Sequence, residues 1–155
     1  MNELARKVGE ALKARGLMLV TAESCTGGWV AVAATAIPGS SDWFERGYVT
    51  YSNAAKREEL GVREDTLGRH GAVSEQTARE MAAGALERGH GHVALAITGV
   101  AGPTGGTPEK PVGMVCFAWA HGSKMLSETK CFDGDRESVR RQSVLHALQG
   151  VLECL

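Results

Sequence analysis

The run from His92 to Thr98, His-Val-Ala-Leu-Ala-Ile-Thr, is the feature that most constrains the fold, because its centre is apolar without interruption. A strand with one face in water alternates polar and apolar residues, whereas a strand covered on both faces does not. The run is typical of the second kind. It therefore predicts a sheet that is covered on both sides.

Patterns elsewhere predict the other elements of an α/β domain. Amphipathic or small-residue patterns predict helices over 3–15, about 27–35, about 53–60, 75–88 and about 135–153. Runs rich in apolar, β-branched or aromatic residues predict strands over 17–20, 43–51, 112–120 and 125–132. Residues 62–74 have no such pattern and are expected to be irregular.

These elements predict a three-layer α/β/α fold, organised as one domain over residues 1–155. The sheet is expected to be mixed and mostly parallel, with about five or six strands. The last two predicted strands are joined through His121-Gly122-Ser123-Lys124, which predicts a late antiparallel hairpin.

Composition excludes several classes of function. The formal net charge is −1, so the charge balance indicates no nucleic-acid partner and no anionic membrane. The four cysteines lack Cys-x-x-Cys spacing and the histidines lack metal-ligand spacing, so we expect no metal site and free thiols in a reducing compartment. No run approaches the length of a membrane span, and the first residues lack the pattern of a secretory signal. We expect a cytoplasmic protein.

The stretch from Thr21 to Gly28, Thr-Ala-Glu-Ser-Cys-Thr-Gly-Gly, is predicted to be a strand-to-helix turn. Gly27 and Gly28 allow a left-handed backbone or a close approach to a ligand. Backbone N–H groups of Thr26, Gly27 and Gly28 at the helix start favour an anion or a developing oxyanion. Ser24 is then a candidate nucleophile. The alternative is that Ser24 or Thr26 only caps the helix.

Lys56 is a candidate base. If Asn53 caps the short helix that follows, Lys56 lies in its first turn, where the helix dipole disfavours a cation. A lysine that becomes neutral can accept a proton from a serine. The alternative is a side chain that extends into solvent. Tyr51 could donate to the same network, or it could be an ordinary core or edge-strand tyrosine.

A glycine- and proline-rich loop from Gly99 to Pro111 follows the buried strand. Its backbone amides, at Gly99, Ala101 and Gly102 among others, suit a phosphate or a carboxylate. The loop is neither a P-loop nor a dinucleotide-binding turn. The alternative is a flexible surface connection. Thr98, the last residue of the strand, is expected to face the ligand crevice at the carboxyl ends of the strands.

Arg136 and Arg140 begin the last helix and are spaced to share one face. They could form a fork on a phosphate, although solvated surface arginines are common. We expect this arginine face, joined by amides of the glycine-rich loop, to hold the phosphate of a nucleotide, because charge-assisted contacts exceed neutral ones.

Several separated motifs resemble, in one order along the chain, those of the CinA C-terminal-domain family. They are Ala22–Gly28, Tyr51–Lys56, Gly71–Ser74, Thr98–Pro103, Lys110–Gly113, and Gly134–Arg136 with Arg140-Arg141. Stand-alone members of that family are nicotinamide-nucleotide amidases. The resemblance implies hydrolysis of the carboxamide of nicotinamide mononucleotide (NMN) to nicotinate mononucleotide and ammonia, in pyridine-nucleotide recycling, without a metal or another cofactor. The start of the chain at its first helix favours such a dedicated amidase.

The resemblance also implies roles for individual residues. A Ser/Lys catalytic pair falls on Ser24 and Lys56, assisted by Tyr51, Thr98 and one arginine among Arg136, Arg140 and Arg141. A homodimer is implied as well. Two alternatives remain open: an amidohydrolase that uses Cys25 as its nucleophile, since helix N-termini lower thiol pKa values, and a module that binds a nucleotide or a protein partner without catalysis.

Overall fold

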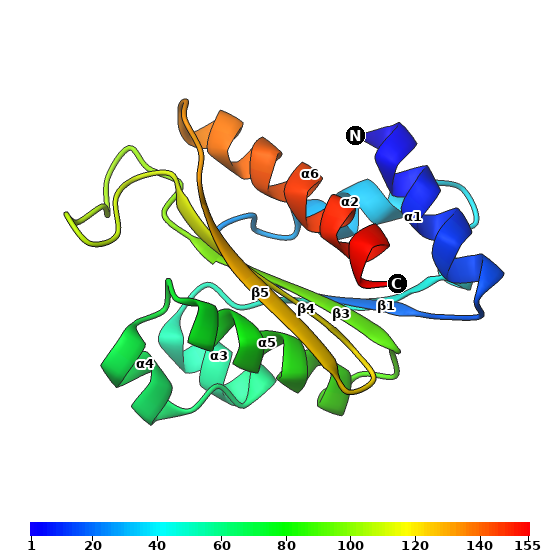
Figure 1. Ribbon diagram of the computed structural model, residues 1–155, viewed down its shortest axis with the longest axis horizontal. Helices are drawn as coiled ribbons and strands as arrows, with labels where there is room; N and C mark the ends of the chain where they lie inside the picture. Colours follow the sequence, from blue (N-terminus) through cyan, green and yellow to red (C-terminus); the bar gives the residue numbers. More distant parts are fainter.

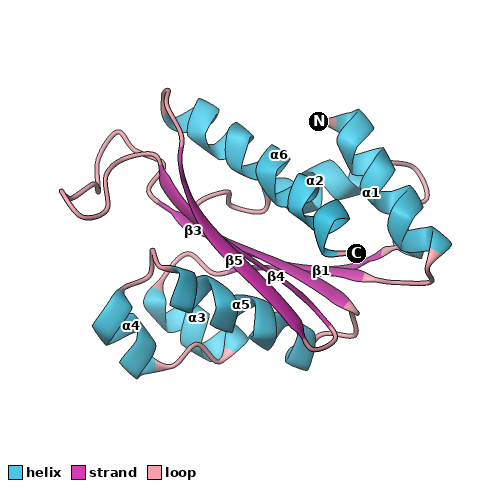
Figure 2. Ribbon diagram, viewed as in Figure 1, coloured by secondary structure: helices cyan, strands magenta, loops and turns pink.

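The computed structural model describes all 155 residues and has three layers, a sheet between two layers of helices (Figure 1). The elements in chain order are α1 (Asn2–Ala14), β1 (Leu19–Glu23), α2 (Trp29–Thr35), the 3-10 turn η1 (Ser40–Asp42), β2 (Phe44–Val49), α3 (Asn53–Leu60), α4 (Glu64–His70), α5 (Glu75–Arg88), β3 (Val93–Gly99), β4 (Met114–His121), β5 (Lys124–Cys131) and α6 (Arg136–Cys154). Helices α1, α2 and α6 cover one face of the sheet, and α3, α4 and α5 cover the other (Figure 2).

The sheet has five strands in the order β2-β1-β3-β4-β5. Strand β1 pairs in parallel with β2 and β3, whereas β4 pairs antiparallel with β3 and β5. Four strands therefore point the same way and only β4 opposes them, although half of the neighbouring pairs are antiparallel. The mixed sheet and the late hairpin are confirmed.

Strand β3 packs against a separate apolar core on each face. Val93, Leu95 and Ile97 contact the cluster built from α1, α2 and α6. Ala94 and Ala96 contact the cluster built from α3, α4 and α5, where small residues let α5 approach the sheet closely. The apolar run shows no alternation because both of its faces are buried.

Two local predictions were wrong. Helix α4 occupies part of the segment that we expected to be irregular. It is short, and its order depends on tertiary contacts: Leu67 is buried, and the Thr66 hydroxyl donates to Glu80 of α5. Helix α3 is capped by Ser52 and not by Asn53, because the Ser52 hydroxyl accepts from the amide of Ala55 at 3.0 Å.

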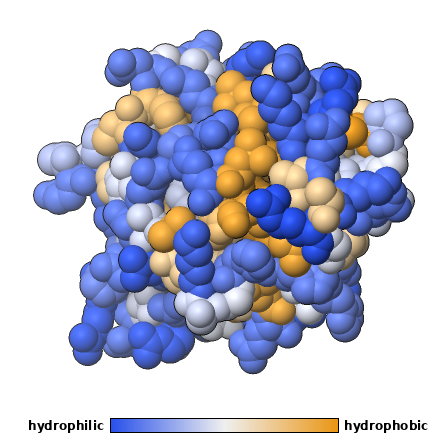
Figure 3. Space-filling model, turned by 45° about the vertical axis from the view of Figure 1, so that its right-hand side comes forward, coloured by the Kyte–Doolittle hydropathy of each residue, from blue (hydrophilic) through white to orange (hydrophobic).

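The surface is largely hydrophilic on the face drawn in Figure 3, with apolar residues gathered in a band across it. No helix combines the length and the apolar composition needed to span a membrane. All four cysteines are free, and no cluster of three or more His, Cys, Asp or Glu side chains has the geometry of a metal site.

Candidate active site

Three segments meet at the carboxyl edge of the parallel strands. Ser24 follows β1, Thr50 follows β2, and Gly99 ends β3 before the loop that projects from the body in Figure 1. The amide of Ser24 donates to the carbonyl of Ile97 at 2.9 Å, and the amide of Thr50 donates to the carbonyl of Glu23 at 2.9 Å. These bonds fix the start of each segment, as the topology of a parallel sheet predicts.

Ser24 and Lys56 lie side by side in the interior. The Lys56 Nζ lies 2.9 Å from the Ser24 Oγ and donates to the carbonyl of Thr50 at 2.8 Å. Lys56 is only 2% exposed and takes part in no ion pair. Burial lowers the pKa of Lys56, since the charged form is poorly solvated there. Burial therefore shifts the equilibrium of Lys56 toward the neutral amine, next to a hydroxyl, and a neutral amine in this place can act as a general base.

Glu23, which our sequence analysis missed as a functional residue, shapes the turn that carries Ser24. Its fully buried carboxylate accepts from the Thr26 hydroxyl at 2.7 Å and from the amides of Val30 and Ala31 at 2.8 and 3.2 Å. Burial raises the pKa of Glu23, and these bonds oppose that rise. An acidic residue at the end of a buried strand, just before the amides of a helix start, was the available signal.

The first amides of helix α2 therefore donate to the carboxylate of Glu23. Its N-cap is Gly28, which has a left-handed backbone with φ of 98° and offers no side chain. The interpretation of Ser24 or Thr26 as the helix cap was wrong, because Glu23 takes that role. The amides of Val30 and Ala31 are therefore not free for a ligand.

The backbone of the turn leaves a narrower set of donors for an oxyanion than expected. The amide of Gly27 donates to the carbonyl of Ser24 at 3.0 Å, and the amide of Gly28 is directed to Glu23. The amides of Cys25 and Thr26 have no acceptor within the protein. We expected the amides of Thr26, Gly27 and Gly28 to be available to a ligand, but only the Thr26 amide is free. The Cys25 amide, which we did not expect, is free as well.

The two arginines of α6 have different partners. Arg140 donates from Nε to the carbonyl of Cys25 at 3.0 Å and from Nη2 to that of Thr26 at 3.1 Å, and it stacks on Trp29. Arg136 donates from Nη1 to the carbonyl of Gly102 at 2.9 Å and from Nη2 to the Tyr51 hydroxyl at 2.9 Å. They do not form the common fork that we expected, because backbone carbonyls and a hydroxyl already accept from them.

Neither the Tyr51 hydroxyl nor the Thr98 hydroxyl forms a hydrogen bond with the Ser24–Lys56 pair. The Tyr51 side chain is 63% exposed, and its hydroxyl accepts from Arg136 and not from Lys56. Thr98 is 1% exposed and donates to the carbonyl of Ala72 at 2.8 Å. The expectation that the Thr98 hydroxyl faces the crevice was therefore wrong, since that hydroxyl fastens the segment before α5 to the sheet.

A pocket of about 290 Å³ opens at Ser24. Its wall includes much of the glycine-rich loop, as predicted, and its lining residues are Ser24, Cys25, Tyr51, Val73, Gly99, Val100, Ala101, Gly102, Thr104, Gly105 and Arg136. Arg136 also borders a second pocket of about 570 Å³ beside Thr26, Gly27, Gly28 and Arg140. The structure thus brings most of the predicted site residues around two adjoining pockets.

Cys25 lies in the pocket wall but has little thiolate character. Burial raises the pKa of its thiol to about 12. The thiol is protonated at neutral pH, and only a thiolate is a strong nucleophile. The raised pKa of the buried thiol therefore argues against Cys25 as the nucleophile, and the contact of Ser24 with Lys56 favours Ser24.

Comparison with known proteins shows the family of this chain. The chain matches the profile of the CinA C-terminal domain over residues 1–155. It is 57% identical over 150 residues to the nicotinamide-nucleotide amidohydrolase PncC of Escherichia coli (strain K12), covering 96% of this chain and 91% of that protein. The protein of the same name from Pseudomonas putida is 53% identical over 153 residues, covering 99% and 96%.

A solved structure has the same fold. The competence/damage inducible protein CihA from Agrobacterium tumefaciens superimposes with a TM-score of 0.96 at 46% sequence identity, covering 99% of this chain and 94% of that one. The agreement extends over all three layers, and so over every element that contributes to the site.

Proposed function

This chain belongs to the CinA C-terminal domain family, and we propose that it is a nicotinamide-nucleotide amidohydrolase that uses Ser24 as nucleophile and Lys56 as base. The reaction converts NMN and water to nicotinate mononucleotide and ammonia, a step of pyridine-nucleotide recycling. Support comes from the printed activity of relatives that are more than half identical over nearly the whole chain. The observation that carries the mechanism is the buried contact of 2.9 Å between Lys56 and Ser24.

Acylation begins when the Ser24 Oγ attacks the carboxamide carbon while neutral Lys56 accepts the hydroxyl proton. The C–N bond of the tetrahedral intermediate then breaks as Lys56 returns the proton to the nitrogen, so ammonia leaves. The free amides of Cys25 and Thr26 are the donors best suited to the oxyanion, at about 3 kcal/mol for a well-placed donor.

Deacylation uses the same groups in reverse. Lys56 accepts a proton from water, whose oxygen attacks the ester carbon, and then returns the proton to the Ser24 Oγ as the ester bond breaks. The nucleotide leaves as its carboxylate. No step requires a metal ion, and the only proton carrier is Lys56.

The activity assay is direct. Purified protein is incubated with excess NMN in the presence of EDTA, and ammonia is measured over time, with Ser24→Ala as the matched control. We expect many turnovers from the wild type and a loss of about a thousandfold or more in the variant. Binding of NMN without ammonia would instead favour a nucleotide-binding module.

The pH profile identifies the base. Burial lowers the pKa of Lys56, so kcat/KM rises with pH as the amine loses its proton, in a range below the ordinary lysine value. On the acidic side the rate falls about tenfold per pH unit, because only the neutral amine accepts the proton. Cys25→Ala retains activity in this mechanism, whereas loss of activity in that variant would favour the thiol.

We also infer a cytoplasmic homodimer. Free cysteines suit a reducing compartment. Val32 and Val49 are large apolar side chains with more than half of their surface exposed, which a second copy would cover. Sedimentation velocity of the wild type and of Val49→Asp tests this, and a monomeric wild type contradicts it.

A further inference from the structure

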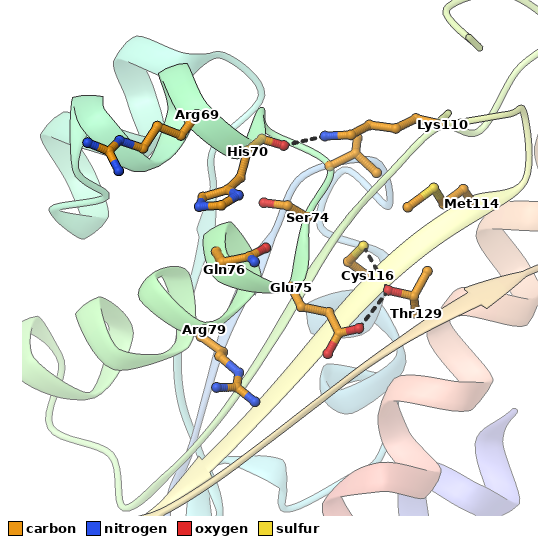
Figure 4. Close-up of a pocket in the computed structure, with 11 residues that line it drawn as sticks. Arg69, His70, Ser74, Glu75, Gln76, Arg79, Lys110, Met114, Cys116 and Thr129 are labelled. Carbon is orange, nitrogen blue, oxygen red and sulfur yellow. Dashed lines mark hydrogen bonds between the residues drawn. The ribbon is translucent and has the colours of Figure 1, made fainter. Parts of the chain in front are cut away.

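The largest cavity of the molecule lies beside the Ser24 pocket and plays no part in the mechanism above. It has a volume of about 600 Å³ and lies between the segment from α4 to α5 and strands β4 and β5 (Figure 4). Val73 lines both this cavity and the Ser24 pocket, so the two are adjacent. Because Val73 forms part of both walls, a substrate bound at Ser24 lies next to this cavity.

The cavity has more basic than acidic side chains in its lining, and two of its three cations form no ion pair. Arg69, Arg79 and Lys110 line it. Arg69 pairs with Asp65, whereas Lys110 and Arg79 take part in no ion pair. The one acidic side chain, Glu75, turns its oxygens to the hydroxyls of Ser127 and Thr129 at 2.8 and 2.9 Å. An anion in the cavity would therefore be attracted, chiefly at the Lys110 end, which Figure 4 shows away from Glu75.

Lys110 is fixed in place, unlike an ordinary surface lysine. Its amide donates to the Thr107 hydroxyl at 3.0 Å, and its carbonyl accepts from the Thr107 amide at 2.9 Å. Its Nζ donates to the carbonyl of His70. An ammonium group has three donors, so the remaining ones are available to a ligand without a large loss of side-chain entropy.

Gly71 makes this position of Lys110 possible. A Cβ at Gly71 would lie 2.8 Å from the Lys110 Nζ, and its φ of +77° disfavours any residue with a side chain. The Lys110 ammonium group is thus where two of the sequence motifs come together, Gly71–Ser74 and Lys110–Gly113. The proposed mechanism gives neither of them a role.

We propose that the Lys110 end of this cavity binds the phosphomonoester of the nucleotide substrate, while the carboxamide lies at Ser24. The inference rests on the proposed function for the identity of the substrate. Arg136 and Arg140 each donate two hydrogen bonds to backbone carbonyls or to Tyr51, so they hold the turn and the loop of the site in place. The Lys110 ammonium has no acidic partner within the protein and donates only to the carbonyl of His70, so it keeps donors for a phosphate, whose oxygens accept strong charge-assisted bonds.

The kinetic test compares NMN with nicotinamide riboside, which lacks the phosphate, in wild type, Lys110→Ala and Lys110→Arg. We expect Lys110→Ala to raise KM for NMN about ten- to a hundredfold with little change in kcat, and to lower the preference for NMN over the riboside by a similar factor. Lys110→Arg recovers part of the loss because it keeps the charge. Lys130→Ala, on the exposed part of β5, is the matched control and behaves as wild type.

Calorimetry with inorganic phosphate separates this inference from the proposed function. Wild type should bind phosphate, and Lys110→Ala should bind it about ten- to a hundredfold more weakly, whether or not ammonia is formed. If wild type binds phosphate in this way but releases no ammonia from NMN, the proposed function fails and the anion site stands. Unchanged phosphate affinity in Lys110→Ala, or an equal loss on NMN and the riboside, overturns the site.

Discussion

The turn from Ser24 to Gly28 and the loop from Val100 to Gly113 follow neighbouring parallel strands at one edge of the sheet, yet they are held in different ways. Three side chains support the turn: the buried Glu23 and Lys56, and the partly buried Arg140, which donates to two of its carbonyls. At the base of the loop, the amide of Val100 donates to the carbonyl of Met114 at 2.9 Å. Most of the tip of the loop is exposed.

This difference indicates that the turn and the loop have different roles in the reaction. Donors and acceptors that are fixed before the substrate arrives stabilise a transition state without reorganisation. The turn meets that condition, at the cost of burying an acid and an amine whose pKa values are both shifted against their charged forms. The loop contains no buried acid or amine. Changes in the turn should therefore alter kcat and stability, and changes around the loop should alter KM.

The largest effect is expected for Lys56→Met. This variant removes the proposed general base beside the turn and replaces it with an apolar side chain of similar length. Activity should fall about a hundred- to ten-thousandfold. The free energy of unfolding should stay within about 1 kcal/mol of wild type or rise, because replacing a buried amine by an apolar group is often neutral or stabilising. Ammonia release and urea unfolding measure the two quantities. A stable variant with wild-type kcat would remove Lys56 from the mechanism.

Glu23→Ala tests whether the carboxylate beneath the turn sets its shape. Three donors lose their acceptor, so the free energy of unfolding should fall by about 1.5–3 kcal/mol, and kcat should fall more than KM changes. Glu23→Gln keeps one acceptor oxygen but places an amide donor near the helix amides, so it should rescue only part of both losses. Thermal melts measure the change in stability, and steady-state kinetics measure kcat and KM. An unchanged kcat in Glu23→Ala would mean that Glu23 contributes only to stability.

Arg140→Ala tests whether the hydrogen bonds from Arg140 support the turn. Its two bonds to the carbonyls of Cys25 and Thr26 support the backbone next to Ser24. We expect kcat/KM to fall about tenfold, by the same factor for NMN and for nicotinamide riboside. A loss confined to NMN would contradict this outcome and return Arg140 to the phosphate-binding role that the sequence predicted for it.

The smallest effect is expected for Tyr51→Phe, on the loop side of the comparison. The variant removes the hydroxyl that accepts from Arg136, while the bond from Arg136 to Gly102 remains. KM for NMN should rise about two- to tenfold, with kcat close to wild type. A hundredfold loss of kcat would instead make Tyr51 a catalytic residue and weaken the division between the turn and the loop.

The sequence by itself determined the layered fold, because patterns of burial are local. The uninterrupted apolar run to Thr98 required a strand covered on both faces, and the alternation of strands with helices placed Ser24 and Gly99 at one edge. It also made Lys56 a candidate base, since a cation near a helix N-terminus is unusual. These inferences depend only on neighbours in sequence and on the topology of parallel strands, whereas the pairing of Lys56 with Ser24 came from the resemblance to the CinA C-terminal-domain family.

Only the tertiary structure decided which groups satisfy one another. Arg140 reaches a turn more than a hundred residues before it, Thr98 donates to Ala72, and Lys110 meets His70. Glu23 replaces an N-cap that the local pattern assigned to Ser24 or Thr26. A buried donor or acceptor takes whichever partner the packed layers bring within about 3 Å, and sequence spacing carries no information on that distance.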